Sequence, residues 1–380
     1  MDRPKQDIVE HEDALAVRRD RMLATFNLFA AVGIFLAFPF VMTAGAEFFL
    51  PLFAAIIIAI ALVPALEWLE RRRVPSSLAA AICVLGFVLA VNGALAVIVL
   101  PASDWFVELP DKLPRIQHNL APVIDLYSSL NDYVARTSAQ VGSGPVARGD
   151  VASGAVPSSV VDLIATSAPS AAIEIFFALL VIFFLLAGWR RARTRTIEAQ
   201  GSFDSALKTA RIIQNVVSAT SAYLTTITII NVTLGLSVAF VLWLLGMPSP
   251  LMWGGIVALF NFVPYVGPIA AALLLGVGGL MTYDTIGMAL LPAAIMIGCH
   301  LVEANIFTPV VLGRRLTMNP LLILISLSYW GWVWGAMGAL LAVPILVIVM
   351  TIIGSTGLPA FLVFLMRGDD DDDDEAVATP

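Results

Sequence analysis

Two ionisable side chains lie inside an apolar segment towards the C-terminal end of the sequence. His300 and Glu303 are the only ionisable residues between positions 286 and 312. Because they are three residues apart, they lie on one face of a helix, where the carboxylate could take up a proton or a cation and the imidazole titrates near neutral pH. The alternative is a structural pair that locks two helices together. One His and one Glu fall short of three protein ligands for zinc, so we expect neither a metal site nor a cofactor.

A break interrupts the apolar stretch 250–281, at "FNFVPYVGP" (260–268). It contains an amide, two prolines, a tyrosine and a glycine: Asn261, Pro264, Tyr265, Gly267 and Pro268. Pro264 cannot donate a hydrogen bond to the carbonyl of Phe260, and Pro268 cannot donate one to that of Pro264. Free carbonyls inside a membrane are tolerated only within protein or against water. Together with the Asn261 amide they predict a site for a cation or a hydroxylated solute; the alternative is a hinge or packing kink.

Two further groups of polar residues accompany these segments. Asn305 and Thr308 are three apart and add polar groups beside Glu303, although hydrogen bonding between helices explains them equally well. Thr228, Asn231 and Gly235 share a face of the segment 223–246, for solute contact or for close helix packing. The predicted solute or ion pathway therefore comprises Asn231, Asn261, Pro264, Tyr265, Gly267, Pro268, His300, Glu303, Asn305, Thr308 and Pro309.

The composition places these residues in a membrane. Of 380 residues, 59% are hydrophobic and 13% are charged. No Asp, Glu, Lys, Arg or His occurs between Arg211 and Asp284 or between Arg315 and Arg367. Each crossing takes about 20 apolar residues, so the chain crosses the membrane several times. The sequence has no GxxxxGK[ST], HExxH or CxxC motif, and no nucleophile with a matching base, which argues against a nucleotide-driven motor and an enzyme.

The layout predicts an all-α integral membrane protein with about eight membrane segments. The expected regions are a cytoplasmic leader (1–21), three transmembrane helices (22–100), an extracytoplasmic region (101–170), a transmembrane helix (171–189), a basic cytoplasmic segment (190–222), a transport region (223–353) and an acidic cytoplasmic tail (354–380). The first part of the extracytoplasmic region has apolar residues at helical spacing, and 137–159 is rich in Gly, Ser and Pro.

Two of the apolar blocks, 250–281 and 319–353, are predicted to be broken or re-entrant helical hairpins. A straight helix over the first block would be roughly 46 Å long, against a hydrocarbon core of about 30 Å. Each half would be roughly 20 Å, too short to cross alone. The second block breaks at "YWGWVWG" (329–335), so the two blocks resemble an internal repeat. Interrupted pairs of this kind mark binding sites in transporters. Bent spans are the alternative.

Lysine and arginine predict the orientation. The leader has five, the loop 67–77 three and the segment 190–211 six, whereas 101–170 has four against seven acids. Basic loops stay in the cytoplasm, so we expect both termini there. Hairpins would also keep Arg314 and Arg315 inside, whereas a full crossing by 250–281 would place them outside.

Three stretches resemble the AI-2E (autoinducer-2 exporter-like) transporter family. They are "GMPSPLMWGGIVALFNFVPYVGPIAA" (246–271), "HLVEANIFTPVVLGRRLTMNPLLILISL" (300–327) and "GWVWGAMGALLAVPILV" (331–347). The resemblance implies a multi-pass bacterial inner-membrane protein that forms a homo-oligomer, for which a pentamer is one possibility. Some members are assigned export of the quorum-sensing signal autoinducer-2, and others sodium (lithium)/proton antiport. The acidic tail and the Gly/Ser/Pro-rich stretch depart from the family layout.

These observations together predict a secondary transporter that exports a small polar solute, such as autoinducer-2, by alternating access. The alternative is a sodium or lithium/proton antiporter that uses Glu303 and His300, and a third is a membrane scaffold without transport. The expected partners are the solute, a monovalent cation or a proton, the lipid bilayer and further copies of the chain. Nothing in the sequence suggests nucleic-acid binding.

Overall fold

The structure, a computed structural model, describes residues 3–141, 160–308, 310 and 319–355, and every regular element in these ranges is helical. The all-α prediction is therefore confirmed for the part of the chain that is described. In chain order the elements are α1 (Arg3–Ala44), α2 (Ala46–Arg71), α3 (Ser76–Val141), α4 (Val160–Glu198), α5 (Phe203–Leu244), α6 (Pro250–Phe260), α7 (Val266–Thr282), α8 (Ile286–Val302), the π-helix η1 (Glu303–Phe307) and α10 (Pro320–Ser355).

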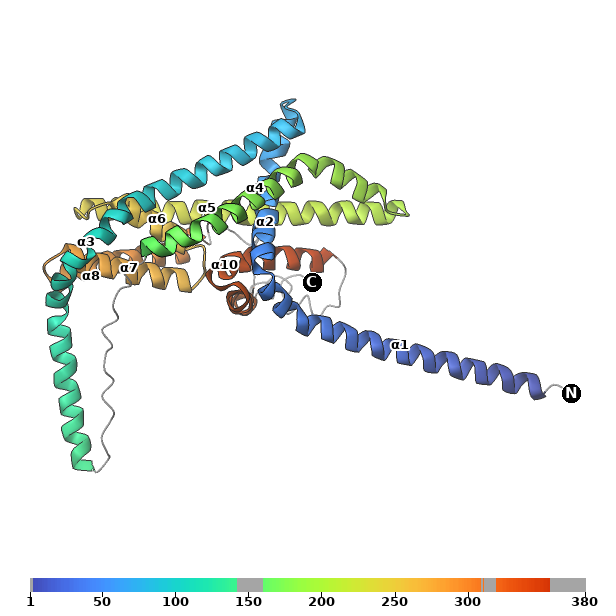
Figure 1. The fold of residues 1–380 in the computed structure, drawn as a ribbon, viewed down its shortest axis with the longest axis horizontal. Coiled ribbons are helices and arrows are strands. Elements are labelled where there is room, and N and C mark those ends of the chain that lie inside the picture. Colours follow the sequence, from blue (N-terminus) through green and yellow to red (C-terminus); the bar gives the residue numbers. More distant parts are fainter. Residues whose placement is uncertain (1–2, 142–159, 309, 311–318, 356–380) are drawn as a thin grey trace, which may run out of the picture.

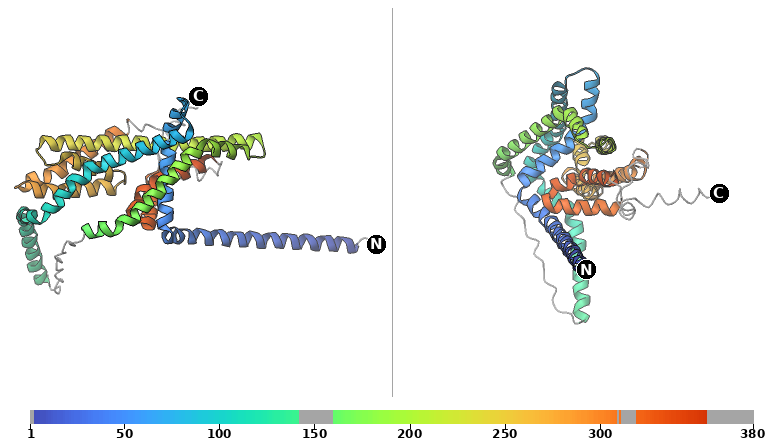
Figure 2. Two further views of the ribbon diagram at one scale, coloured as in Figure 1. Left: turned by 45° about the horizontal axis from the view of Figure 1, so that its top comes forward. Right: turned by 90° about the vertical axis from the view of Figure 1, so that its right-hand side faces the viewer.

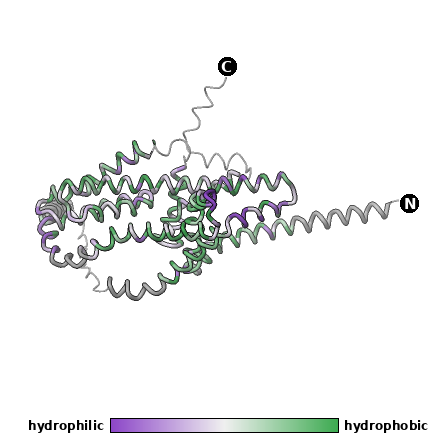
Figure 3. Tube along the Cα trace, turned by 90° about the horizontal axis from the view of Figure 1, so that it is seen from above, coloured by the Kyte–Doolittle hydropathy of each residue, from purple (hydrophilic) through white to green (hydrophobic). Residues whose placement is uncertain are grey.

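Seven helices in the described ranges are long and apolar enough to cross a membrane, and α6 and α7 are shorter apolar helices. Figures 1 and 2 show α5, α6, α7 and α8 stacked along one another, with α3 running beside them and α1 projecting away. In Figure 3 the coloured parts of the helices are hydrophobic over most of their length, and hydrophilic residues gather at turns such as the one between α4 and α5. The apolar exterior is what a lipid-facing helix requires.

The block 250–281 folds back on itself. α6 has 11 residues and α7 has 17, so the two helices are only about 16 Å and 26 Å long. The Tyr283 hydroxyl donates a hydrogen bond to the Leu245 carbonyl over 3.2 Å, which joins the chain before α6 to the chain after α7. Both ends of the α6–α7 pair therefore lie together, and the pair is a helical hairpin with its tip at 261–265.

The second block, 319–353, also folds back on itself, within α10. The dihedral angles of Trp334 and Gly335 are not helical, and Gly335 has a φ of 62°, which a glycine adopts without strain. The Ser326 hydroxyl donates to the Ala342 carbonyl over 2.8 Å, so the arms on either side of the break lie against each other. The first arm, 320–333, is about 21 Å long, which is shorter than a membrane core. The predicted break at 329–335 is confirmed.

The two hairpin tips meet inside the protein. Val263, at the tip of the α6–α7 hairpin, packs against a core that contains Trp330 and Trp334 of α10. The indole Nε1 of Trp334 donates to the Met42 carbonyl at the end of α1 over 2.9 Å. The tip of the second hairpin is thereby fixed to the α1–α2 corner, while the tip of the first lies on it.

The helices run on past the predicted membrane segments. The helical part predicted after residue 100 continues α3 without interruption to Val141. The basic segment 190–222 is divided between α4 and α5, and the Ser202 hydroxyl accepts from the Ser205 amide to begin α5. Most of the Gly/Ser/Pro-rich stretch (142–159), Arg314, Arg315 and nearly all of the acidic tail (356–380) lie outside the described residues, as do the expectations made for them.

A glycine makes each hairpin possible. A Cβ on Gly267 would lie 1.8 Å from the Phe260 carbonyl oxygen, and one on Gly338 would lie 1.9 Å from that of Trp330. Both distances are far below any real contact. The helices of each hairpin therefore approach closely only because the residue just after the turn has no side chain. The two blocks share this way of packing.

We predict that Gly267→Ala destabilises the protein by about 1–3 kcal/mol, because the new methyl group forces the two helices of the hairpin apart. Gly276→Ala in the same helix is the matched control, since its Cβ would make an ordinary contact at 3.8 Å with Ala293. Thermal unfolding of the detergent-purified variants measures the difference. Equal melting temperatures for the two variants would show that the close approach at Gly267 is not a constraint.

Candidate functional site

The tip of the α6–α7 hairpin is a strained turn. The Val266 amide donates to the Pro264 carbonyl over 2.7 Å, and Tyr265 between them has φ 64° and ψ −54°. This is a γ-turn of the rare form that costs energy for any residue with a side chain. The Tyr265 side chain itself is exposed. A turn that is maintained against its own strain is a frequent property of functional sites.

The two carbonyls that the prolines were expected to leave free already have partners. The Phe260 carbonyl accepts from the Val263 amide over 3.0 Å, and the Pro264 carbonyl accepts from Val266. Pro268 stands in the first turn of α7, where a missing N–H costs nothing. Short local bonds of the turn therefore replace the lost helical ones, and the carbonyls do not form an open cradle. The polar character of the tip comes from side chains instead.

Asn261 carries that polar character. Its side chain is buried at the end of α6, and its Nδ2 donates over 2.8 Å to Oδ1 of Asn231, a fully buried residue of α5. The two helices come this close because Gly235 faces Gly254, where a Cβ on either would lie within 2.4 Å of the other residue's carbonyl oxygen. The Nδ2 of Asn231 has no hydrogen-bond partner in the structure. A buried donor without a partner is costly, so it points to a bound water or solute.

Glu303 is a further buried polar residue, next to Asn261. Its carboxylate is buried, accepts a hydrogen bond from the Thr308 hydroxyl, lies 3.1 Å from Nδ1 of His300 and has the Asn261 side chain as a polar neighbour. Nδ1 of His300 is close but not aligned for a hydrogen bond. We use the name buried polar cluster for Asn231, Asn261, His300, Glu303 and Thr308. It joins α5, the hairpin tip and the end of α8.

The helix geometry changes at the cluster. α8 ends at Val302, and Glu303–Phe307 form a π-helix. A π-turn inserts an extra residue into one turn of a helix and is frequent at functional sites. Here it brings the Thr308 hydroxyl to the Glu303 carboxylate, five residues earlier in the chain. No feature of the local sequence had predicted this turn.

Glu303 also lines a small cavity. Its volume is about 200 Å³, and it lies between α5 and the end of α8. Thr233, Ser237 and Glu303 supply the polar groups of its lining, and the other lining residues are apolar. Glu303 therefore belongs both to the cluster and to the lining of the cavity. Thr233 and Ser237 were not among the predicted pathway residues.

Comparisons with known proteins assign the chain to a family. The family model described as AI-2E family transporter matches residues 23–357. The chain belongs to the AI-2E family of transporters. It is similar to AI-2 transport protein TqsA of Escherichia coli K12, with 27% identity over 80% of this chain and 85% of TqsA. It is also similar to YhhT of the same strain, a candidate transport protein by name, with 27% identity over 80% of this chain and 83% of YhhT. A Haemophilus influenzae protein of the same description is 24% identical over 79% of this chain and 84% of its own length.

Within this AI-2E chain, the structure brings together only some of the predicted pathway residues. Asn231, Asn261, His300, Glu303 and Thr308 meet in the buried polar cluster. Asn305 is exposed and donates to the Leu301 carbonyl of its own helix, so it points away. Pro264, Gly267 and Pro268 shape the tip, and Pro309 lies outside the described residues.

Only part of the predicted polar face of α5 points inward. Asn231 and Gly235 are buried against α6, whereas Thr228 is exposed and its hydroxyl donates to Leu224 of its own helix. Thr228 therefore does not share the inner face. Gly235 serves the close helix packing that was one of its two expected roles.

We predict that the Asn231–Asn261 hydrogen bond couples the two residues energetically by about 0.5–1.5 kcal/mol. Leu is the test substitution, because it is similar in size to Asn and cannot form a hydrogen bond. Thermal unfolding of Asn231→Leu, Asn261→Leu and the double variant gives the coupling as a departure from additivity. Strictly additive effects would mean that the contact contributes nothing. Asn305→Leu, which changes an exposed amide, is the control and should act additively with Asn231→Leu.

Proposed function

We propose that this AI-2E chain is a secondary transporter that binds a small polar solute at the buried polar cluster and moves it by alternating access. The observation that carries the proposal is the position of Asn261 at the tip of a broken helix, between the buried Asn231 and Glu303 side chains. Broken helices that meet inside a membrane protein are the usual setting of transporter binding sites. Ionisable residues at that depth are functional by default.

The size and the chemistry of the site favour a small solute with hydroxyl or carbonyl oxygens. The cavity of about 200 Å³ is smaller than the roughly 300–1,000 Å³ of pockets for drug-sized ligands. The unpartnered Nδ2 of Asn231 would donate to a solute oxygen, and the Glu303 carboxylate would accept from a solute hydroxyl. The name of the relative TqsA, AI-2 transport protein, supports a solute of the same kind. Export is the direction that we propose.

Exchange of a monovalent cation for a proton is the second candidate. The contact of 3.1 Å between His300 and Glu303 favours it, because a carboxylate can hold a sodium or lithium ion or a proton while a neighbouring imidazole changes its charge. The two activities need different groups. A solute carrier depends on the amides Asn231 and Asn261, whereas an antiporter depends chiefly on the acid and the imidazole.

We further propose that the chain lies in a bacterial inner membrane with both termini in the cytoplasm, as a homo-oligomer. In this arrangement α6–α7 enters from the outside and returns to it. The guanidinium of Arg115, in the continuation of α3 beyond its membrane span, lies 3.2 Å from Asp284, which follows α7. A full crossing by 250–281 would separate these two groups by about the thickness of the membrane, roughly 30 Å. Their contact therefore supports a re-entrant hairpin.

Flux measurements in proteoliposomes test the function. For a solute carrier, Asn261→Ala and Glu303→Gln should each lower the flux of autoinducer-2 by about tenfold or more, because the first removes a buried hydrogen-bonding group and the second removes the charge of a buried carboxylate. Asn305→Ala and Glu47→Gln, which change an exposed amide and an exposed acid, are the matched controls and should leave the flux unchanged. Wild-type flux in Asn261→Ala and Glu303→Gln would remove the support for this site.

The same vesicles distinguish the antiporter. Sodium-driven proton movement, followed with a pH-sensitive dye, should be lost in Glu303→Gln and retained in Asn231→Leu if antiport is the activity. Solute flux that does not respond to a sodium gradient would contradict antiport. If the wild-type protein shows neither solute flux nor cation-driven proton movement, the scaffold hypothesis is the one that remains.

Cysteine labelling tests the proposed topology. In a background without Cys83 and Cys299, the only two cysteines, we expect Asp284→Cys to react with a membrane-impermeant maleimide added outside intact cells. Arg73→Cys, which is also exposed, should react only after the membrane is opened. The hairpin is wrong if Asp284→Cys is protected in intact cells while Arg73→Cys behaves as expected.

A further inference from the structure

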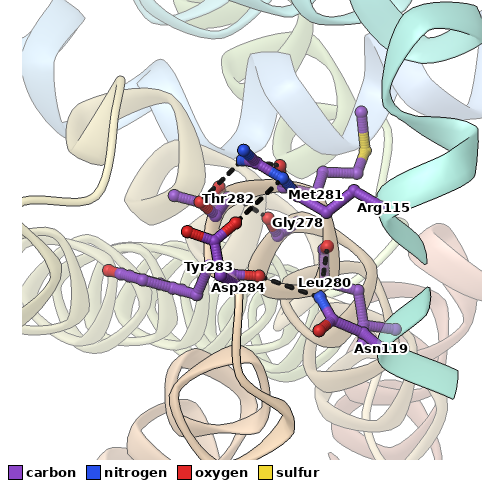
Figure 4. Close-up of polar contacts among 8 residues, drawn as sticks. All are labelled: Arg115, Asn119, Gly278, Leu280, Met281, Thr282, Tyr283 and Asp284. Atoms are coloured by element: carbon purple, nitrogen blue, oxygen red, sulfur yellow. Dashed lines mark hydrogen bonds and ion pairs between the residues drawn. The ribbon is translucent and has the colours of Figure 1, made fainter.

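Two side chains of α3 hold the C-terminal end of α7 (Figure 4). The Nη1 of Arg115 donates to the Thr282 carbonyl over 3.2 Å and to the Met281 carbonyl over 3.4 Å. The Nδ2 of Asn119 donates to the Tyr283 carbonyl over 2.8 Å and to the Leu280 carbonyl over 3.2 Å. Four consecutive carbonyls, 280–283, thus receive donors from residues more than 160 positions earlier in the sequence.

These contacts satisfy groups that a helix cannot satisfy by itself. The last four carbonyls of a helix have no partner within it, and α7 is followed by Tyr283 rather than by a glycine cap. Asn119 is 3% exposed, so its two hydrogen bonds are shielded from water. The Arg115–Asp284 ion pair, with side chains 44% and 81% exposed, is a weak contact by comparison. Asn119 is therefore the stronger of the two anchors.

The other helix of the hairpin is held by the same stretch of α3. The Trp105 ring packs edge-on against Trp253 of α6, with ring centroids 5.2 Å apart. A Cβ on Gly255 of α6 would lie 2.6 Å from Ile98, so the two helices touch closely there. With the Tyr283–Leu245 hydrogen bond, the base of the hairpin is fixed at several points. Its tip has instead a strained turn and the buried polar cluster.

We infer that Arg115 and Asn119 are positioning residues for transport: they fix the base of the α6–α7 hairpin, so that the movement that opens and closes the site takes place at its tip. This inference rests on the proposed function. Neither residue reaches the buried polar cluster; each acts by setting where α7, and with it Asn261, stands relative to Glu303. The alternative is that the contacts at the base break and form again in every transport cycle; we call this arrangement a latch.

Cross-linking the base separates an anchor from a latch. Arg115→Cys and Asp284→Cys are combined in the background without Cys83 and Cys299, and the pair is joined with a short bis-maleimide. Flux of autoinducer-2 and sodium-driven proton movement are then measured before and after the reaction. An anchor predicts that cross-linking leaves the activity of the double-cysteine variant within about twofold of its own value before the reaction, since the joined positions do not move apart. Loss of activity on cross-linking, in a parent that is active, overturns the inference.

A second variant tests the positioning role of Asn119. In Asn119→Asp the shape is retained, but a carboxylate cannot donate to the carbonyls of Leu280 and Tyr283. We expect the initial rate at low solute concentration to fall about tenfold. Gln117→Glu, the same chemical change at an exposed position of α3, is the control and should retain the rate. The cross-link between positions 115 and 284 should restore much of the activity of Asn119→Asp, which a general folding defect would not allow.

Amide hydrogen exchange provides a readout that does not depend on transport. Exchange in 278–286 should become faster in Asn119→Asp than in Gln117→Glu, because the end of α7 loses its partners. Unchanged exchange, or no rescue of Asn119→Asp by the cross-link, contradicts the inference. If the wild-type protein moves neither solute nor ions, the proposed function fails instead, and faster exchange in Asn119→Asp would still establish the anchor.

Discussion

The break between α6 and α7 leaves peptide groups and an amide side chain inside an apolar helical stack, where water is not at hand to satisfy them. Most polar groups of the tip are paired within the protein. The Phe260 and Pro264 carbonyls accept short local hydrogen bonds. Asn261 pairs with Asn231 across the α5–α6 contact, and that contact exists because Gly235 and Gly254 have no side chains to separate the helices. The polar site follows from the need to pair the groups that the broken helix exposes.

The same requirement divides the hairpin into a fixed part and a part under strain. At the base, donors from α3 satisfy four carbonyls, and aromatic packing holds α6. At the tip, Tyr265 has an unfavourable γ-turn, and the Nδ2 of the buried Asn231 has no partner. A bound solute or ion that satisfies this donor would stabilise one position of the tip over another. Ligand binding and movement are then linked by a difference in contacts, which population shift requires.

Local features of the sequence predicted the elements, and long-range packing decided the site. Pro264 and Gly335 mark the two breaks because they disturb a helix within a few residues, and the spacing of His300 and Glu303 places both on one face. The Asn231–Asn261 bond joins positions 30 residues apart, and the contacts of Asn119 join positions more than 160 apart. Such pairs depend on which helices pack together, which periodicity does not reveal. The carbonyls of the break were expected to be free because the turn's own hydrogen bonds were not foreseen.

Distances between spin labels in liposomes test the central claim, that the tip of the hairpin moves while its base stays in place. Labels at Tyr265 and Ile229, both exposed, report on the tip relative to α5, and labels at Gln117 and Asp284 report on the base. The account predicts two distances at the tip, with populations that change when autoinducer-2, sodium or acid is added, and one unchanged distance at the base. A single constant distance at the tip, or a second distance at the base, would contradict it.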